Sequence, residues 1–139
     1  GRSKDTIVLL NGENIEPLPI EARLLESYYI DQCMVVGQDQ KSLGVLIVPS
    51  LDHLRGAGVE AKSLAEISLS AKARQLVEED IRNLINHSAG FKSFERITSF
   101  RLLAKTFDVG DEMTNTFKLK RHVITDRYAH LIAEMFHQA

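Results

Sequence analysis

Two short segments of the chain concentrate side chains that could do chemistry. Near the C-terminal end, the run TNTFKLKR over residues 114–121 places Lys118, Lys120 and Arg121 close together. At the start, GRSKD is followed closely by the turn NGENIEP over residues 11–17. A cluster of cations can hold an anion, and a glycine lets the backbone approach a ligand closely. Both segments also have a plainer interpretation, because charge runs usually face solvent and Asn-Gly favours an ordinary hairpin turn.

The overall charge makes any anion-binding site a local feature. Seventeen Lys and Arg stand against nineteen Asp and Glu, for a net charge of −2, which argues against a generally basic nucleic-acid-binding surface. The sequence contains no P-loop, no G-x-G-x-x-G and no G-x-S-x-G motif. We therefore expect that this chain does not carry a whole active site.

The histidines and the cysteine do not predict a metal site. The histidines, His53, His87, His122, His130 and His137, are scattered without the spacing that zinc ligands require. The single cysteine, Cys33, lies in an apolar run that reads as a core strand. We expect no metal ligand among these residues.

The composition fits one compact domain from a reducing compartment. A chain of 139 residues that is 44% hydrophobic can bury a single core. A lone cysteine cannot form an intramolecular disulfide, so we expect a cytoplasmic protein. No apolar stretch approaches the ~20 residues of a membrane helix, and no signal-peptide pattern opens the chain. Because the chain begins with GRSKD and not with methionine, we expect it to be a piece of a longer protein.

The hydrophobic pattern predicts an α+β fold, a small β-sheet with an N-terminal β-hairpin, packed against helices. We expect strands at 6–10, around Ile15 and at 97–103, and a hairpin of 30–37 with 44–49 at the centre of the sheet. We expect helices at 19–27, 69–85 and 121–136. The helix over 69–85 has the clearest apolar face, formed by Leu69, Ala73, Leu76, Val77, Ile81, Leu84 and Ile85.

Both unusual segments resemble one enzyme superfamily. The opening GRSKDTIVLLNGENIEPLPIE is similar to the start of the C-terminal domain of adenylate-forming enzymes. The pattern there is G-R-x-(K/D)-D, an apolar strand, a G-(E/x)-(N/x)-I turn and then P-x-x-I-E. The late run TNTFKLKR resembles the T-x-S-G-K-I-x-R loop of the same superfamily. Because the two matches lie at opposite ends of the chain, the resemblance covers nearly all of it.

The late loop departs from the commoner pattern of the superfamily. Thr116 and Phe117 stand where Ser-Gly usually precedes the lysine, and a phenylalanine makes the loop less flexible than a glycine would. This form of the loop is similar to that of the long-chain fatty acyl-CoA synthetases. The long stretch between Pro49 and Phe91 resembles the same branch.

The resemblance implies a catalytic role for Lys118. In these enzymes the corresponding lysine reaches the substrate carboxylate and the α-phosphate of ATP while the acyl-adenylate forms. A cation placed between two anions relieves their repulsion, and one close charge pair is worth about 4 kcal/mol at an effective dielectric constant near 20. The resemblance therefore assigns electrostatic stabilisation of the adenylation step to Lys118.

The resemblance also assigns the opening residues. Lys4, with Asp5, falls on the hinge whose backbone torsions absorb a rotation of the domain. The turn of residues 12–14, which is Gly12, Glu13 and Asn14, falls on a segment that lines the pantetheine tunnel when the thioester forms. Arg2 either anchors the linker or reaches the nucleotide.

Residues 1–139 are thus expected to be the single mobile C-terminal domain of a long-chain fatty acid–CoA ligase, with 1–5 as the linker to an N-terminal adenylation domain. The resemblance implies ATP, CoA and Mg²⁺ as ligands, bound mainly by that other domain, so the chain alone is expected to be inactive. It also implies a fatty acid substrate and a cytoplasmic enzyme that could associate with membranes through the parent protein.

Two alternatives stay open at the level of sequence. The first keeps the superfamily but changes the acid substrate, or replaces CoA by the thiol of a carrier protein. The second is a stand-alone interaction module that binds an acidic partner or nucleic acid through the basic face of residues 118–127.

Overall fold

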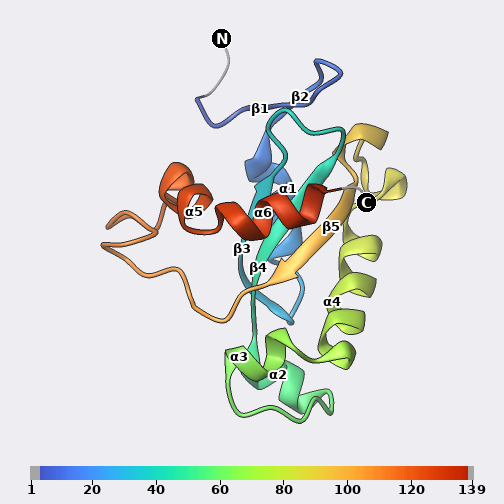
Figure 1. The fold of residues 1–139 in the computed structure, drawn as a ribbon. Helices are drawn as coiled ribbons and strands as arrows, with labels where there is room; N and C mark the ends of the chain where they lie inside the picture. Colours follow the sequence, from blue (N-terminus) through green and yellow to red (C-terminus); the bar gives the residue numbers. More distant parts are fainter. Residues whose placement is uncertain (1–3, 138–139) are drawn as a thin grey trace.

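The structure is a computed structural model that describes residues 4–137, arranged as two small sheets and a set of short helices (Figure 1). The strands are β1 (Ile7–Val8), β2 (Asn14–Ile15), β3 (Ile30–Val36), β4 (Leu43–Pro49) and β5 (Ile97–Leu102). The α-helices are α1 (Pro17–Leu24), α2 (Leu51–Gly56), α3 (Leu64–Ser68), α4 (Ala71–Leu84), α5 (Arg121–Arg127) and α6 (Ala129–Phe136). Short 3₁₀ turns lie at His87–Ala89 and Ser93–Glu95. The predicted α+β class and its N-terminal β-hairpin are confirmed.

The main sheet has the strand order β3-β4-β5. β3 and β4 form the predicted antiparallel hairpin, with Val35 opposite Val45. β5 then pairs with β4 in parallel, which requires a long crossover, and residues 50–96 with α2, α3 and α4 supply it. The centre of the sheet is therefore β4 alone, whose seven residues are all buried, while β3 and β5 are edge strands.

The sheet is covered on both faces, and each face has its own hydrophobic core. On one face, Val45 and other strand residues pack with α1, α4 and the β1–β2 hairpin. On the other face, Leu46 packs with Ile124 of α5 and Met135 of α6. Figure 1 shows α6, in red, crossing in front of the sheet. Gly44 permits this approach, since a Cβ atom there would lie 2.6 Å from Cε of Met135.

The predicted helix over 69–85 begins two residues late. Leu69 is the C-cap residue that follows α3 and is 87% exposed, so its assignment to the apolar face was wrong. The reason is local, because the hydroxyl of Ser70 accepts a hydrogen bond from the N–H of Ala73 at 3.1 Å and caps α4. Ala73, Val77 and Ile81 form the buried face as expected.

The predicted helix over 121–136 is divided into α5 and α6 at Tyr128, where ψ is 25°. Hydrogen bonds from Tyr128 N–H to Ile124 O (3.0 Å) and from Ile132 N–H to Tyr128 O (2.9 Å) cross the break, so it is a kink. A straight helix of this length would extend ~24 Å, whereas three strands span only ~10 Å. The kink lets α6 follow the sheet while α5 lies beside it (Figure 1).

A buried ion pair joins the two ends of the chain. The guanidinium of Arg121, at the start of α5, donates to both carboxylate oxygens of Glu21 in α1, at 2.7 and 2.6 Å. Glu21 also accepts a hydrogen bond from the backbone N–H of Val35 in β3, at 2.8 Å. One carboxylate therefore joins α5 to α1 and β3, which lie near the other end of the chain.

Among the residues that the structure describes, no helix has the combination of length and apolar character that crossing a bilayer requires.

Breaking this pair should cost far more stability than breaking a surface pair. We expect Arg121→Ala to lower the free energy of unfolding by about 3–5 kcal/mol, because it leaves the Glu21 carboxylate buried without its cation. The matched control is Arg82→Ala, which removes the exposed i,i+4 pair with Glu78 and should cost about 0.5 kcal/mol or less. Urea unfolding followed by circular dichroism measures both. Equal losses in the two variants would contradict this account of the pair.

Cys33 offers a chemical probe of the same core. Its side chain is 4% exposed in β3, and burial, together with the charge of Glu21, raises the pKa of the thiol. Because the thiolate is the reactive form, we expect reaction with an aromatic disulfide reagent to be about 100-fold or more slower in the folded chain than in concentrated guanidinium chloride. Rapid stoichiometric reaction in native buffer would show that β3 is not buried as described.

Candidate functional site

Lys118 lies at the end of a tight turn in the long loop between β5 and α5. The N–H of Thr114 donates to Lys118 O at 2.9 Å, and the N–H of Lys118 donates to the Thr114 hydroxyl at 3.1 Å. Within the same turn, the N–H of Phe117 donates to Thr114 O at 2.9 Å. The backbone of Lys118 is thereby fixed. Its exposed side chain makes no ion pair with any residue between 4 and 137.

Phe117 has a left-handed backbone, with φ of 64°, and its ring is 73% exposed. A residue with a Cβ pays on the order of 1–3 kcal/mol for this conformation, whereas glycine adopts it freely. Phe117 stands where the superfamily motif usually has glycine, and its backbone has the left-handed conformation that glycine favours. Because the ring is exposed, its burial contributes little free energy, so the hydrogen bonds of the turn offset the strain.

Glu112 anchors the loop before the turn. Its side chain is 0% exposed and accepts hydrogen bonds from Lys105 Nζ at 2.6 Å and from the N–H of Asp108 at 2.9 Å. Arg127 Nη1 lies 2.8 Å from the same carboxylate. Burial raises the pKa of Glu112, but the hydrogen bonds from Asp108 and Lys105 outweigh burial, and the pKa ends below its usual value. Glu112 is therefore an ionised anchor at neutral pH.

The basic face of residues 118–127 is largely compensated within the chain. Arg127 donates to both oxygens of Asp111, at 2.9 and 3.0 Å, and this pairing lowers the pKa of Asp111. Arg121 is paired with Glu21. Of the four cations on this face, Lys118 and Lys120 remain without an ion pair among residues 4–137. On this face the two arginines therefore stabilise the fold through ion pairs, whereas the two lysines do not.

The predicted hinge residues, Lys4 and Asp5, lie beside the end of this loop. Asp5 is 3.9 Å from Nε of Arg121, and Lys4 is exposed. Lys4 and Asp5 line a groove of about 640 Å³ together with residues from β3, α5, α6 and the loop of residues 103–120, which we call the lysine loop. The first described residues and the segment around Arg121 therefore meet at one groove. Arg2, the predicted linker or nucleotide residue, lies outside the described residues.

The turn at Gly12, Glu13 and Asn14 is exposed, and the hairpin that carries it is held by the β3–β4 turn. Gly12 has φ of 90°, with nothing near the position of a Cβ atom. The hairpin docks on the β3–β4 turn, where Val8 N–H donates to Gln38 Oε1 at 3.0 Å and Asp39 N–H donates to Val8 O at 2.9 Å. A glycine at the tip leaves the backbone open to a ligand.

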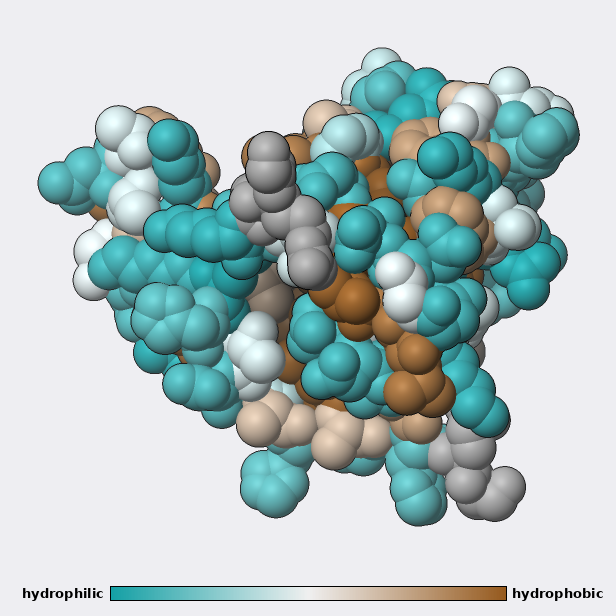
Figure 2. Space-filling model, turned by 90° about the horizontal axis from the view of Figure 1, so that it is seen from above, coloured by the Kyte–Doolittle hydropathy of each residue, from teal (hydrophilic) through white to brown (hydrophobic). Residues whose placement is uncertain are grey.

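The structure does not bring all predicted site residues together. Neither Lys118 nor the turn of residues 12–14 lines the groove that contains Lys4 and Asp5. In Figure 1 the tip of the blue hairpin lies at the top of the molecule, and the orange loop that ends at α5 projects from one side. Figure 2, seen from above, shows this projecting lobe as mainly hydrophilic, and hydrophobic residues show through in a strip near the middle of the face. Lys118 and the turn are therefore presented on different parts of the surface.

Sequence reasoning missed the residues that hold the loop. Glu21 lies inside the P-x-x-I-E motif, but its ion pair with Arg121 spans a hundred positions and no local pattern announces it. Glu112 stands in an acidic, exposed-looking run, and only the fold buries it. One signal in the sequence could have indicated that Glu21 is buried: it lies between Ile20 and Leu24, on the apolar side of a predicted helix.

Comparison with known proteins identifies the fold and the family. The family model described as the AMP-binding enzyme C-terminal domain matches residues 4–139. A chloroplast long-chain-fatty-acid–[acyl-carrier-protein] ligase of Arabidopsis thaliana is 31% identical over 98% of this chain and 17% of its own length. A long-chain-fatty-acid–CoA ligase of Mus musculus is 33% identical over 98% of this chain and 23% of its own length.

Among solved structures, the adenylation domain of a carboxylate reductase from Mycobacterium chelonae has the same fold, with a TM-score of 0.79 at 20% identity. That similarity covers 96% of this chain and 19% of the other. The chain spans about a fifth of the length of the curated relatives that it matches. The superfamily resemblance of its two end motifs is confirmed: this chain belongs to the family of AMP-binding enzyme C-terminal domains.

Proposed function

We propose that this chain is the mobile C-terminal domain of a ligase that activates a long-chain fatty acid with ATP and passes the acyl group to a thiol. Relatives named as long-chain fatty acid ligases support the substrate class. The chain spans only about a fifth of their length, so the ATP site and the acyl pocket belong to an N-terminal domain in this proposal. The isolated chain is then folded but inactive.

Lys118 is the adenylation lysine in this proposal. In the first half-reaction a carboxylate oxygen attacks the α-phosphorus of ATP and pyrophosphate leaves. The negative charges of the two reactants come together at that step, and an ammonium group placed between them stabilises the transition state. The observation that carries the assignment is a difference among the cations of residues 118–127. Arg121 and Arg127 are bound by carboxylates of this chain. The backbone of Lys118 is held by the turn, and its side chain makes no ion pair with the described residues.

The two half-reactions use different faces of the domain. In the second half-reaction a thiol sulfur attacks the acyl carbon of the adenylate and AMP leaves. The turn of residues 12–14 then lines the thiol tunnel, because its glycine lets the backbone approach the ligand. A rotation of the domain about Lys4 and Asp5 replaces one face by the other at the active site. The separation of Lys118 from the turn of residues 12–14 on the surface supports the use of two faces.

The acceptor thiol has two candidates. CoA is the acceptor in the name of the Mus musculus relative, and an acyl carrier protein is the acceptor in the name of the Arabidopsis thaliana relative. We propose CoA as the acceptor, on the resemblance of the lysine loop to that of the acyl-CoA synthetases. The interaction-module alternative loses support at the face of residues 118–127, since both of its arginines are bound by carboxylates of the same chain.

ATP, CoA and Mg²⁺ are the proposed ligands of the parent enzyme. Among residues 4–137, no three His, Cys, Asp or Glu side chains lie together in a group that could hold a metal ion. We propose that the N-terminal domain supplies the ligands of Mg²⁺. The contribution of this chain is the mobile ammonium of Lys118.

Replacing Lys118 tests the assignment in the full-length enzyme. We expect Lys118→Ala to slow acyl-adenylate formation from ATP by about 100- to 1000-fold, because one electrostatic stabiliser of the transition state is lost. Thioester formation from supplied acyl-adenylate should be kept. The matched control is Lys62→Ala, an exposed lysine in the loop before α3, which should change neither half-reaction. Retention of both half-reactions in Lys118→Ala would contradict the proposal.

Phe117 tests whether the turn positions the lysine. We expect Phe117→Gly to keep the adenylation rate within about threefold of wild type, because glycine takes the same positive φ without steric cost. Phe117→Val should lower the rate about tenfold or more, because a β-branched residue resists that conformation and shifts Lys118. Both rates come from the adenylation assay. A drop with glycine and none with valine would mean that the left-handed backbone does not position Lys118.

A further inference from the structure

The carboxylate of Glu112 joins the start of the lysine loop to the helix that follows the loop. Lys105 Nζ, near the start of the loop, lies 2.6 Å from Oε2 of Glu112. Arg127 Nη1, at the end of α5, lies 2.8 Å from the same oxygen. The N–H of Asp108 donates to Oε1 at 2.9 Å. One carboxylate therefore closes the base of the loop.

A short antiparallel ladder joins Glu112 to the turn that presents the lysine. The N–H of Lys120 donates to Glu112 O at 2.8 Å. Next to this bond, Met113 lies opposite Leu119 in an antiparallel bridge. We call the segment of residues 112–120 the lysine hairpin. Because hydrogen bonds connect its two arms, a displacement of Glu112 moves the lysine as well.

The base of the loop is also tied to the main sheet. The N–H of Phe107 donates to Gln32 Oε1 at 2.7 Å, and Gln32 Nε2 donates to Phe107 O at 3.0 Å. Gln32 belongs to the edge strand β3, so its side-chain amide holds the loop as a neighbouring strand would. Met113 is buried in the core between the sheet and α6. The lysine hairpin is thus positioned relative to the sheet.

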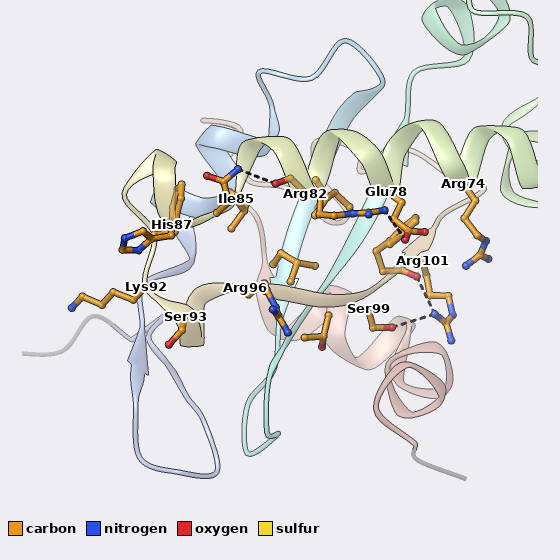
Figure 3. Close-up of a pocket in the computed structure, with 16 residues that line it drawn as sticks. Arg74, Glu78, Arg82, Ile85, His87, Lys92, Ser93, Arg96, Ser99 and Arg101 are labelled. Carbon is orange, nitrogen blue, oxygen red and sulfur yellow. Dashed lines mark hydrogen bonds and ion pairs between the residues drawn. The ribbon is translucent and has the colours of Figure 1, made fainter.

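Glu112 differs from the exposed ion pairs of this chain. Figure 3 shows one of those on α4, where Arg82 lies 3.2 Å from Glu78 and both side chains are more than half exposed. Such a pair contributes little to stability. The side chain of Glu112 is 0% exposed, so its charge has lost its hydration and depends on its partners.

A buried carboxylate is a poor device for stability alone. Apolar side chains of similar volume at such a site often give equal or greater stability, because they lose no hydration. A carboxylate instead requires its donors at defined places. The position of Glu112 at the base of the lysine hairpin therefore favours a role in geometry.

We propose that Glu112 is a positioning residue for Lys118 in the adenylation half-reaction, an inference that rests on the proposed function of Lys118. Glu112 does not touch the reacting groups. Its carboxylate fixes the base of the loop, and the lysine hairpin then places the ammonium group between the two reacting anions. A misplacement of about 1 Å is enough to lower a rate by about 100-fold. The thioester half-reaction uses the turn of residues 12–14 and does not depend on Glu112.

The test measures both half-reactions of the full-length enzyme with Glu112→Gln. Donors face both oxygens of Glu112, whereas a glutamine has one acceptor oxygen and turns an NH₂ group toward a donor. We expect kcat of acyl-adenylate formation to fall about tenfold or more, with KM for ATP changed less than about twofold. Thioester formation from supplied acyl-adenylate should be kept. The matched control is Glu26→Gln, which removes the exposed ion pair with Arg23 and should change neither half-reaction.

A double-mutant cycle separates positioning from a general loss of structure. If Glu112 acts through Lys118, then Glu112→Gln should lower the adenylation rate less than about twofold in the Lys118→Ala background, because the group that it positions is absent there. The same loss in both backgrounds would overturn the proposal, as would a normal rate in Glu112→Gln alone. A normal adenylation rate in Lys118→Ala would instead contradict the proposed function, and the role of Glu112 with it.

Arg127→Ala decides the question if Glu112→Gln also loses thioester formation, which would report a damaged fold. This variant removes one partner of the carboxylate and keeps Lys105. We expect the adenylation rate to fall about threefold or more, and the loss to vanish in the Lys118→Ala background. A loss that persists in that background would show that the cluster around Glu112 does not act through Lys118.

Discussion

The ion pair between Glu21 and Arg121 is the constraint on which the candidate site depends. The buried carboxylate of Glu21 in α1 is stable only if a cation and hydrogen-bond donors surround it. Arg121 supplies the cation, and the N–H of Val35 supplies a further hydrogen bond. This requirement fixes the start of α5 against α1 and β3. Asp5, a predicted hinge residue, lies beside the same guanidinium. The lysine loop ends where this pair begins, so the position of Lys118 follows from it.

The opposite side of the loop is held by the same physics. Glu112 is buried and ionised, and Lys105, Arg127 and the N–H of Asp108 surround its carboxylate. With both ends fixed by buried carboxylates, the turn between them can present one ammonium group to solvent without becoming disordered. Buried pairs contribute little net stability compared with apolar packing, and we infer that the role of these two pairs is to fix the geometry of the loop. In the proposed function the domain moves, and a fixed loop would bring Lys118 to the same place in every cycle.

The sequence predicted the elements that are governed by local rules. The β3–β4 hairpin, the apolar face of α4 from Ala73 to Ile81 and the opening hairpin all follow from spacing and turn residues. The sequence could not predict what depends on distant contacts: the parallel pairing of β5, the kink at Tyr128, or the burial of Glu21 and Glu112. Lys118 was located by motif similarity. That it is free while its arginine neighbours are paired could be read only from the fold.

The central claim is that Lys118 reaches the reacting groups during adenylation, and its most direct test is a structure of the full-length enzyme with a stable acyl-adenylate analogue. The account predicts that Lys118 Nζ lies within about 3.2 Å of a phosphate or carboxyl oxygen of the analogue. It also predicts that the Glu21–Arg121 pair is kept and that the turn of residues 12–14 lies away from the active site. Another cation in that place, with Lys118 in solvent, would contradict the account.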